Sequence, residues 1–546
     1  MSDSDEDMIE SAEVDEELRL TLKENDCGMS TILEPSSMTK GEINFHKAAK
    51  ENDLESVRKL LSEYHVNVNC KNNLDRTALH WASANGNIDV IEKLVEDGAD
   101  LESKDKYGMR PVLWAAWFGH LEAIKVLITG GATPLCTNKQ GMGILHCAAQ
   151  NNHVGVMNFI FESLENMNIN EGEITGRTPL HLASEAGHIE AVMRLIDMSC
   201  DANARDKDGK TALHLAAEAG KSEVIRKLLN LGVEVSDRDA DGKTAMHIAA
   251  EEGHLNVIEV LFDFDAKADT ETIHNGWLET THVKEMSPLH FATSRGHSDI
   301  VTTLIEHGAQ LDVVNFQGNT PLHLAALGNQ SEVTKILIKK KCQVDIQNYR
   351  QQTALHIGVE AGYQDIVEIL LGANASLDLR EKLGKTPLQL AARGSFVAIV
   401  DMIIKAERYY EVTRDYHEKE LDDLDPHLYL RQPRHPSAAQ MKDILWKLAT
   451  KQLKPGDWKK LALYWKFTAE HIRAIEHQYT GTHSYKEHGF RLLMIWLHGV
   501  RKDENVMRLL FEALSATERR NLAEQIRRRA DFRREKFCMN SLCSIT

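Results

Sequence analysis

The chain has 546 residues, with 64 Lys and Arg against 82 Asp and Glu, a net charge of −18, and 42% hydrophobic residues. This length predicts several globular units or one long array, and no apolar run is long enough to span a bilayer. Residues 1–10 lack the basic start and apolar centre of a secretory signal. Eight scattered cysteines without a C-x-x-C spacing argue against a zinc or redox framework. We therefore expect a cytoplasmic protein in a reducing compartment.

The charge is distributed unevenly along the chain. Residues 1–40 are predicted to form an acidic, disordered tail, because charge dominates over apolar residues there. Residues 441–546 hold 21 Lys and Arg and 12 Asp and Glu, a net charge of +9, which leaves −27 for residues 1–440. The acidic front is expected to resist nucleic acid and to attract the basic end in a salt-sensitive way.

A period of 33 residues organises the next part of the chain. The string T-P/A-L-H begins at Thr178, Thr211 and Thr244, and again at Ser287 and then every 33 residues to Thr386. Another copy begins at Thr77, and two degenerate copies begin at Arg110 and Gly143. Such self-similarity predicts about eleven repeats over residues 41–412, interrupted by an insertion near 268–284.

Each repeat has the same internal plan. DGKT or QGNT predicts a tight turn, and an apolar segment such as 212–219 predicts a short helix. A glycine such as Gly187 or Gly220, or Asn at 152 and 329, then suits a left-handed helix end. A second segment such as 222–230 places apolar residues at i, i+3 and i+4, which predicts an amphipathic helix. Stacked neighbours would bury the faces that one repeat cannot.

These residues resemble the ankyrin repeat: T-P-L-H-x-A, then G-H, then V-x-x-L-L. The resemblance implies an all-α helical repeat solenoid with short β-hairpin fingers and a concave groove that binds proteins and performs no chemistry.

Histidine is abundant, and a catalytic or metal-binding role is one interpretation. Eight histidines, however, occupy one column of the repeat, one per layer, too far apart to share a metal ion or a proton. We therefore expect them to join turn and helix by hydrogen bonds. The column is His80, His146, His181, His214, His247, His290, His323 and His356.

The column seven residues after each motif start is expected to line the concave face. Trp117 and its neighbour Phe118 are predicted there as exposed aromatic anchors for a client protein. Glu185, Glu218 and Glu251 form an acidic ladder that would grip a basic peptide. The alternatives are a solvated acidic face and local packing of the aromatic rings.

Four further positions carry hypotheses. Trp81 and Trp114 share the core column with Leu182 and Leu215, so they are predicted to be core residues. Trp277, in the insertion, is a candidate contact at the tip of an extended finger, and a tolerated insertion is the alternative. Asn203 is a candidate for hydroxylation, because ankyrin hairpins resemble substrates of an asparaginyl hydroxylase and Leu195, Asp201 and Asn203 fit its preferred spacing.

Residues 413–437 are Pro-bearing and polar and are predicted to be a linker. Several amphipathic helices then crowd into residues 438–532, a pattern typical of a helical bundle. DWKKLALYWKFTAEHIRAIE, LLMIWL and NVMRLLFEALSATERRNLAEQI resemble a death domain. The resemblance implies a six-helix bundle that assembles with other death domains and performs no catalysis. Its exposed candidates are Lys454, Lys459, Lys460, Lys466, Arg519 and Arg520, and a solvated face is the alternative.

Residues 533–546 form a basic tail that ends in Cys543-Ser544-Ile545-Thr546. This fits a prenylation motif at Cys543, and a lipid chain beside a basic patch would anchor the protein at a membrane surface. Ser544 and Thr546 are not the preferred residues, so a chance match is the alternative.

Repeat array, linker and terminal bundle together resemble the ankyrin repeat and death domain-containing protein family. We expect a non-enzymatic intracellular adaptor or scaffold without cofactors or nucleic-acid partners. Its groove would bind a client protein, and its death domain would recruit signalling partners or a second copy. A prenylated membrane-surface scaffold is the alternative.

Overall fold

The structure is a computed structural model, and it describes residues 38–164, 167–264, 286–414, 435–436, 438–479, 481, 484–501 and 504–526. The chain divides into two compact units, whose described parts lie within residues 38–264 and 286–526. In these ranges no helix has both the length and the apolar character needed to cross a bilayer.

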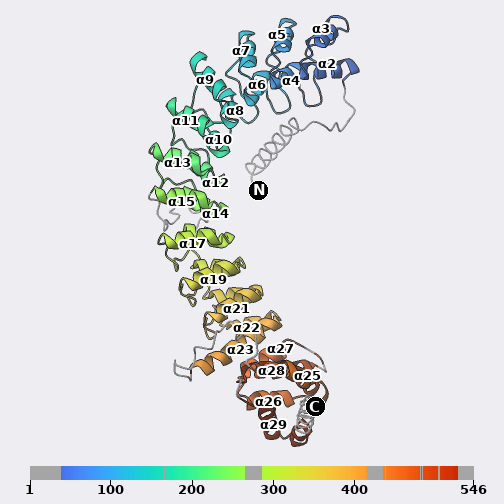
Figure 1. Cartoon of the computed structure of the whole chain (residues 1–546), viewed down its shortest axis with the longest axis vertical. Helices are drawn as coiled ribbons and strands as arrows, with labels where there is room; N and C mark the ends of the chain where they lie inside the picture. Colours follow the sequence, from blue (N-terminus) through green and yellow to red (C-terminus); the bar gives the residue numbers. More distant parts are fainter. Residues whose placement is uncertain are drawn as a thin grey trace, which may run out of the picture. The chain divides into compact units, whose positions relative to one another are not determined.

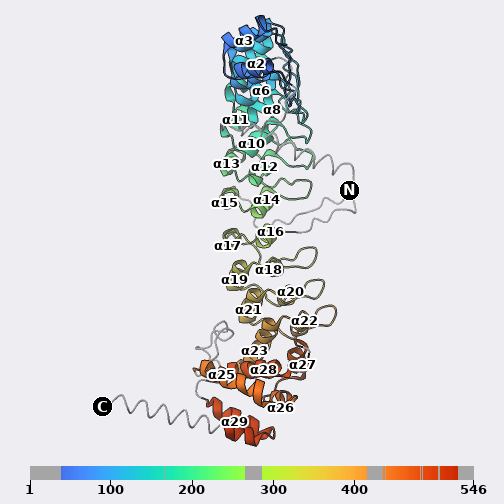
Figure 2. The ribbon, with the colours of Figure 1, turned by 90° about the vertical axis from the view of Figure 1, so that its right-hand side faces the viewer.

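The first unit contains seven repeats of two helices (Figure 1). The first helices of the repeats are α2 (Lys40–Lys50), α4 (Ala78–Asn85), α6 (Pro111–Phe118), α8 (Ile144–Gln150), α10 (Pro179–Ala186), α12 (Ala212–Glu218) and α14 (Ala245–Glu252). The second helices are α3 (Leu54–Ser62), α5 (Ile88–Glu96), α7 (Leu121–Thr129), α9 (Val154–Ser163), α11 (Ile189–Asp197), α13 (Ser222–Asn230) and α15 (Leu255–Asp263). Figure 2 shows α10, α12 and α14 stacked in one column and α11, α13 and α15 in another.

The second unit contains four more repeats and a C-terminal bundle. The repeat helices are α16 (Pro288–Arg295), α17 (Ser298–Glu306), α18 (Pro321–Leu327), α19 (Ser331–Lys339), α20 (Ala354–Ala361), α21 (Gln364–Gly372), α22 (Pro387–Arg393) and α23 (Val397–Arg414). The bundle contains α25 (Ala438–Lys447) with a π-helical continuation at Leu448–Gln452, then α26 (Asp457–Tyr464), α27 (Ala469–His477), α28 (Ser484–Gly499), α29 (Val506–Ala516) and a final helical segment at 520–526. The described residues are thus helical in both units, as the sequence predicted.

The repeat at residues 211–232 shows why these segments fold as they do. Thr211 precedes α12 in extended backbone, and the helix is built of Ala, Leu and His, all buried up to Ala217. Gly220 then takes a φ of 70°, a left-handed conformation that glycine adopts without steric cost. Helix α13 turns Val224, Ile225 and Leu228 inward, and these three side chains are almost fully buried. Burying each stabilises the array by roughly 2 kcal/mol.

The fingers between repeats are tight turns, and no β-strand occurs in the ranges that the structure describes. In the finger that begins at Asp206, the backbone amide of Asp206 donates to the carbonyl of Lys210 at 3.0 Å. The Asp206 carboxylate also accepts from the amides of Asp208 and Lys210 at 3.0 and 2.8 Å. Gly209 has a φ of 71°, and a Cβ there would lie 2.7 Å from the amide nitrogen of Ala240 in the next finger. The close approach of successive fingers therefore requires glycine at this position.

The histidine column joins neighbouring repeats, as predicted. The Thr211 amide donates to Nδ1 of His214 at 3.2 Å, and Nε2 lies 3.2 Å from the carbonyl oxygens of Asp237 and Lys243. A carbonyl can only accept, so Nε2 carries the proton and the ring is neutral. Burial lowers the pKa of His214 to about 4 and that of His80 to about 3. The His214 ring therefore caps its own helix and ties it to the following finger.

The C-terminal bundle has a hydrophobic core of its own. Leu445, Trp458, Leu461, Leu493 and Leu510 are at most 2% exposed. Trp458, Leu461, Leu493 and Leu510 lie in the segments that resemble a death domain, and all five side chains belong to this core.

The bundle packs on the last repeat of the array, with α22 and α23 against α27 and α28 (Figures 1 and 2). The Arg491 guanidinium on α28 contacts the Asp401 carboxylate on α23 at 2.5 Å, and its side chain is only 7% exposed. Nε2 of His471 lies 2.8 Å from Oε2 of Glu407. Gln389 stands where the other repeats have His, and its amide donates to Glu470 of the bundle at 2.5 Å. The bundle thus occupies the place that a following repeat would take.

Candidate protein-binding surfaces

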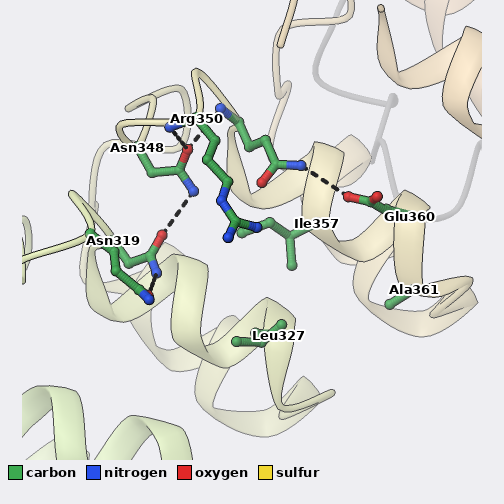
Figure 3. Close-up of a pocket in the computed structure, with 9 residues that line it drawn as sticks. Asn319, Leu327, Asn348, Arg350, Ile357, Glu360 and Ala361 are labelled. Atoms are coloured by element: carbon green, nitrogen blue, oxygen red, sulfur yellow. Dashed lines mark hydrogen bonds between the residues drawn. The ribbon is translucent and has the colours of Figure 1, made fainter. Parts of the chain in front are cut away.

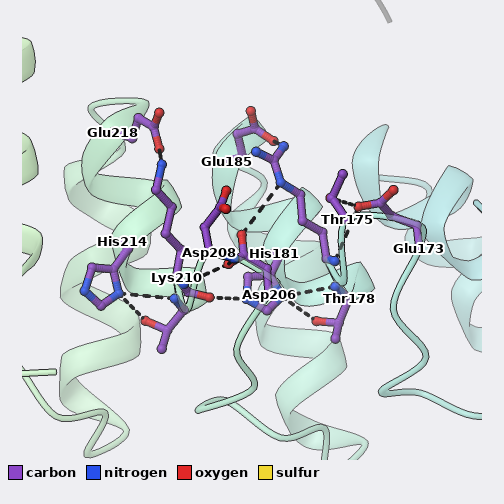
Figure 4. A network of polar contacts seen from close by, with 12 residues as sticks. Glu173, Thr175, Thr178, His181, Glu185, Asp206, Asp208, Lys210, His214 and Glu218 are labelled. Atoms are coloured by element: carbon purple, nitrogen blue, oxygen red, sulfur yellow. Dashed lines mark hydrogen bonds and ion pairs between the residues drawn. The ribbon is translucent and has the colours of Figure 1, made fainter. Parts of the chain in front are cut away.

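The predicted acidic ladder lies on the array, but each of its carboxylates is paired. Glu185 contacts Arg177 at 3.3 Å, Glu218 contacts Lys210 at 2.7 Å, and Glu251 contacts Lys243 at 2.8 Å. In each pair the cation comes from the finger eight residues earlier, and Figure 4 shows Lys210 extended from its finger towards Glu218. The acidic ladder therefore does not present unpaired carboxylates, and its binding of a basic peptide stays a prediction. Three successive repeats of the first unit thus carry a row of ion pairs, each worth below about 1 kcal/mol because the groups remain partly solvated.

Trp117 is also not the exposed anchor that the sequence predicted. Its side chain is 9% exposed, whereas the other residues of its column are half-buried or exposed. Helix α6 lies between α4 and α8. The large indole ring can pack against these neighbouring helices, whereas a shorter side chain at this position stays nearer the solvent. Phe118 is half-buried and stacks on Trp114 with ring centroids 5.8 Å apart.

The two other tryptophans differ from each other. Trp114 is 1% exposed and donates from Nε1 to the Asp105 carboxylate at 3.2 Å, so its assignment to the core is confirmed. Trp81 is only half-buried, with the Arg76 guanidinium 5.3 Å from its ring centroid. Trp81 thus borders the surface, and its assignment to the core was wrong.

The row of ion pairs ends with Lys243 and Glu251 and does not continue into the second unit, where Met286 and Ser294 hold the two positions of the first repeat. Leu327 takes the column position of the glutamates and is 58% exposed, and Asn319 stands where the first unit has Arg177, Lys210 and Lys243. The Asn319 side chain instead accepts from Asn348 at 2.9 Å. An exposed apolar side chain therefore replaces the charged pair at this repeat.

A pocket of about 350 Å³ opens beside Leu327 (Figure 3). Its floor includes Ile357, and one wall is Glu360, which accepts from the Gln352 amide at 2.9 Å. Arg350 is exposed, and its guanidinium points towards Ile357 without an ion pair to any residue in the described ranges. We call Leu327, Arg350, Ile357 and Glu360 the Leu327 pocket. It combines an apolar floor with an unpaired cation.

Apolar side chains extend this surface along the fingers of the same unit. Phe316 is 36% exposed, Tyr349 70% and Leu383 72%. In the first unit the fingers before Thr211 and Thr244 carry Lys207, Asp208, Ala240 and Asp241, whereas the finger before Thr178 carries Ile174, which is 55% exposed. Sequence reasoning missed the pocket, although one signal was present: Leu327 is the one aliphatic residue larger than alanine in a column otherwise filled mainly by polar side chains.

The basic residues predicted on the bundle surface have different environments. Lys459 pairs with Glu476 at 2.5 Å, and Lys460 with Glu518 at 3.4 Å. Arg519 contacts the buried Asp457 carboxylate at 2.9 Å, so it has a structural role. Lys454, Lys466 and Arg520 are exposed.

Two apolar side chains beside these lysines were missed. Leu463 and Tyr464 are 63% and 46% exposed and follow Lys459 and Lys460 on α26. Lys460 lies three and four residues before them, so the three side chains share one side of the helix. We call Lys459, Lys460, Leu463 and Tyr464 the α26 surface.

Three modification and contact hypotheses remain untested. Trp277 and Cys543 lie outside the described residues. Asn203 is exposed, and its backbone amide donates to the Asp201 carboxylate at 2.9 Å, which places Asn203 in a turn between repeats.

Within the described ranges, no three His, Cys, Asp or Glu side chains are grouped closely enough to hold a metal ion. Burial raises the pKa of the Cys70 thiol to about 11 and that of Cys342 to about 12, and it also raises the pKa of Cys147. These thiols are therefore protonated at neutral pH and are poor nucleophiles.

Comparison with known families gives two matches. A model of ankyrin repeats (three copies) matches residues 45–138, 115–206, 187–274, 271–348 and 341–415. A death domain model matches residues 442–530. Ankyrin repeats and death domains are non-catalytic modules of protein–protein interaction and signalling.

Individual relatives match only short stretches. Alpha-latroinsectotoxin-Lt1a of Latrodectus tredecimguttatus is 34% identical over 14% of this chain and 6% of its own length. Ankyrin repeat domain-containing protein 49 of Homo sapiens is 39% identical over 10% of this chain and 23% of its own length. The human ASB11 ankyrin repeat domain is 27% identical, with 42% of this chain and 98% of that structure covered at a TM-score of 0.38.

Proposed function

The chain belongs to the ankyrin-repeat family and carries a C-terminal death domain, and from this we propose that it is a non-enzymatic, cytoplasmic adaptor. The array captures a client protein, and the death domain recruits a signalling partner or a second copy of the chain. The observation that carries the proposal is the exposed Leu327 in the column that holds paired glutamates in the first unit, which provides an apolar surface beside the unpaired Arg350.

The chemistry of the Leu327 pocket defines the client. An exposed leucine beside Ile357 favours an apolar side chain, and burying one contributes roughly 2 kcal/mol. Arg350 favours a carboxylate on the same segment, because its planar guanidinium donates two parallel hydrogen bonds to such a group. We therefore expect a client segment with an apolar anchor next to Asp or Glu. The exposed Tyr349 and Leu383 would extend the contact.

The double variant N319K/L327E tests this pocket. It re-creates at this repeat the pair that Lys210 and Glu218 make, so it closes the pocket with a contact that the array already tolerates. In co-precipitation with quantitative mass spectrometry, the variant should lose the client proteins that the natural chain retains. Because N319K also removes the hydrogen bond from Asn348, urea unfolding is measured in parallel and binding is compared where both chains are folded.

L231E is the matched control, because Leu231 is 48% exposed in the first unit, away from the pocket. It should retain the same proteins as the natural chain. Equal retention of every protein by N319K/L327E and the natural chain would contradict the assignment of the pocket.

The α26 surface is the proposed contact of the death domain. Exposed aromatic and aliphatic side chains beside lysines are typical of an interface that combines an apolar centre with a charged rim. The variant K460E/Y464E should weaken self-association in analytical ultracentrifugation or remove the signalling partner from co-precipitates. Exposed Lys442 on α25 offers the control K442E, which should change neither.

A further inference from the structure

A cleft of about 670 Å³ lies where the last repeat meets the death domain, between α22 and α27. Its residues come from both modules: Lys385, Leu388 and Arg393 from the array, and Glu470, Arg473 and His477 from the death domain. Any molecule in this junction cleft would touch both modules at once. Neither the Leu327 pocket nor the α26 surface has this property.

The rim of the junction cleft is cationic. Lys385, Arg393 and Arg473 are exposed, and none of their side chains forms an ion pair with a residue in the described ranges. Among the lining residues Glu470 is the one carboxylate, and its Oε1 already accepts from Gln389 and Thr386 at 2.5 and 3.3 Å. The cleft therefore has unpaired positive charge, in contrast to the paired face of the first unit.

The floor of the cleft is apolar and shallow. Leu388, Ala392 and Ala474 are 5%, 8% and 4% exposed. Small apolar residues under a rim of guanidinium and ammonium groups suit an extended peptide with carboxylates along its edges. No Phe, Tyr or Trp lines the described wall, so it lacks the large aromatic stacking platform typical of single-stranded nucleic-acid sites.

We propose that the junction cleft binds an acidic, extended segment of a protein partner, held by Arg393 of the array and Arg473 of the death domain. This goes beyond the proposed function, because it assigns a third interaction site. It also couples the modules: a segment that bridges the two arginines stabilises the docked arrangement of the last repeat and the death domain.

The test is binding of a fluorescein-labelled peptide rich in Glu and Asp to the full chain, followed by fluorescence anisotropy. The same peptide with Gln and Asn in place of its acids is the uncharged counterpart. The variant R393E/R473E reverses one charge in each module without removing any hydrogen bond or ion pair of the described residues. The control K339E/K442E makes the same charge change, one residue per module, at exposed positions away from the cleft.

The proposal predicts that R393E/R473E raises the Kd at least about tenfold, that the control changes it less than about twofold, and that the uncharged peptide does not bind. Equal weakening by the two variants would assign the binding to net charge and overturn the site. Displacement of the peptide by inorganic phosphate at matched ionic strength would identify a simple anion site instead. Tighter binding after removal of residues 1–37 would mean that the chain's own acidic segment occupies the cleft, which would overturn the assignment to a partner.

Discussion

A single hydrogen-bonding side chain per repeat determines much of how the array is held together. Six histidines of the column accept at Nδ1 from their own helix start and donate at Nε2 to the next finger, as His290 does to the carbonyl of Asn319 at 3.1 Å. His146 departs from this arrangement. Gly143 stands in place of the threonine, and Nε2 of His146 is buried without a partner in the structure. The contact between the repeat of His146 and the next finger therefore lacks hydrogen bonds that the repeats of the six other histidines have.

The substitution Gly143→Thr is predicted to strengthen that contact. Gly143 has a φ of −90° and a ψ of −177°, a backbone that threonine adopts readily, and an added Cβ would meet no atom closer than 3.6 Å. The new hydroxyl would bond to Nδ1 of His146 as Thr178 does to His181 at 2.9 Å. We expect a gain of about 1–2 kcal/mol in the free energy of unfolding in urea.

Gly143→Ala is the control, because it adds the Cβ without the hydroxyl. It should give the smaller part of the gain, about 0.5–1 kcal/mol. A threonine variant no more stable than the alanine variant would show that the hydroxyl makes no useful bond.

The buried histidines also predict acid sensitivity. Burial lowers the folded pKa of His214 and His290 below 6.5, so the unfolded chain binds more protons below that pH and stability falls on acidification. For His214 and His290 the loss runs from pH 6.5 down to about 4, at roughly 1 kcal/mol per pH unit for each ring.

His214→Gln tests this pH dependence with a residue that the chain itself uses at position 389. Glutamine keeps an acceptor for the helix start but does not titrate. Urea unfolding between pH 4 and 7 should show a shallower fall for the variant by about one proton. An unchanged slope would mean that His214 does not contribute to the acid sensitivity.

At the scale of elements, the death domain terminates the array by packing where another repeat would stack. Helix α27 contacts α22, and Gln389 reaches Glu470 instead of a following finger. The best-buried ion pair of this junction is Asp401 with Arg491, whose side chains are 23% and 7% exposed. The last repeat and the bundle should therefore unfold together.

Asp401→Asn is predicted to destabilise both modules at once. It leaves the Arg491 guanidinium buried without its carboxylate, and loss of one partner of such a pair costs about 3–5 kcal/mol. Hydrogen exchange should accelerate in α22 and α23 as well as in α27 and α28. Glu512→Gln, which removes the exposed pair with Arg508 on α29, is the control and should change exchange little. Faster exchange confined to one module would contradict the shared unit.

Some features of the helices and fingers could be predicted from the sequence, and others could not. Helix starts, helix ends such as Gly187 and the histidine column follow local rules and were predicted. The burial of Trp117 was not, because it depends on what the neighbouring helices leave uncovered. The Glu218 ladder was identified, but its pairing with Lys210 requires knowing that a finger folds back over its own helix. The Leu327 pocket and the junction cleft arise between elements, where spacing within one repeat gives no information.

At the scale of the whole molecule, the chain combines a row of paired charges in its first unit with unpaired surfaces in its second. The Leu327 pocket, the junction cleft and the α26 surface all belong to residues 286–526. Each differs in chemistry, so each should take a different ligand. An adaptor needs this independence, because capture of a client must not block recruitment of the signalling partner.

The most direct measurement compares the proteins that co-precipitate with the natural chain, with N319K/L327E and with K460E/Y464E, all as full chains under conditions where each is folded. The account predicts two separate losses: the pocket variant loses the clients and keeps the death domain partners, and the α26 variant does the reverse. If both variants lost the same proteins, or neither lost any, the array and the death domain would not act as the two arms of an adaptor.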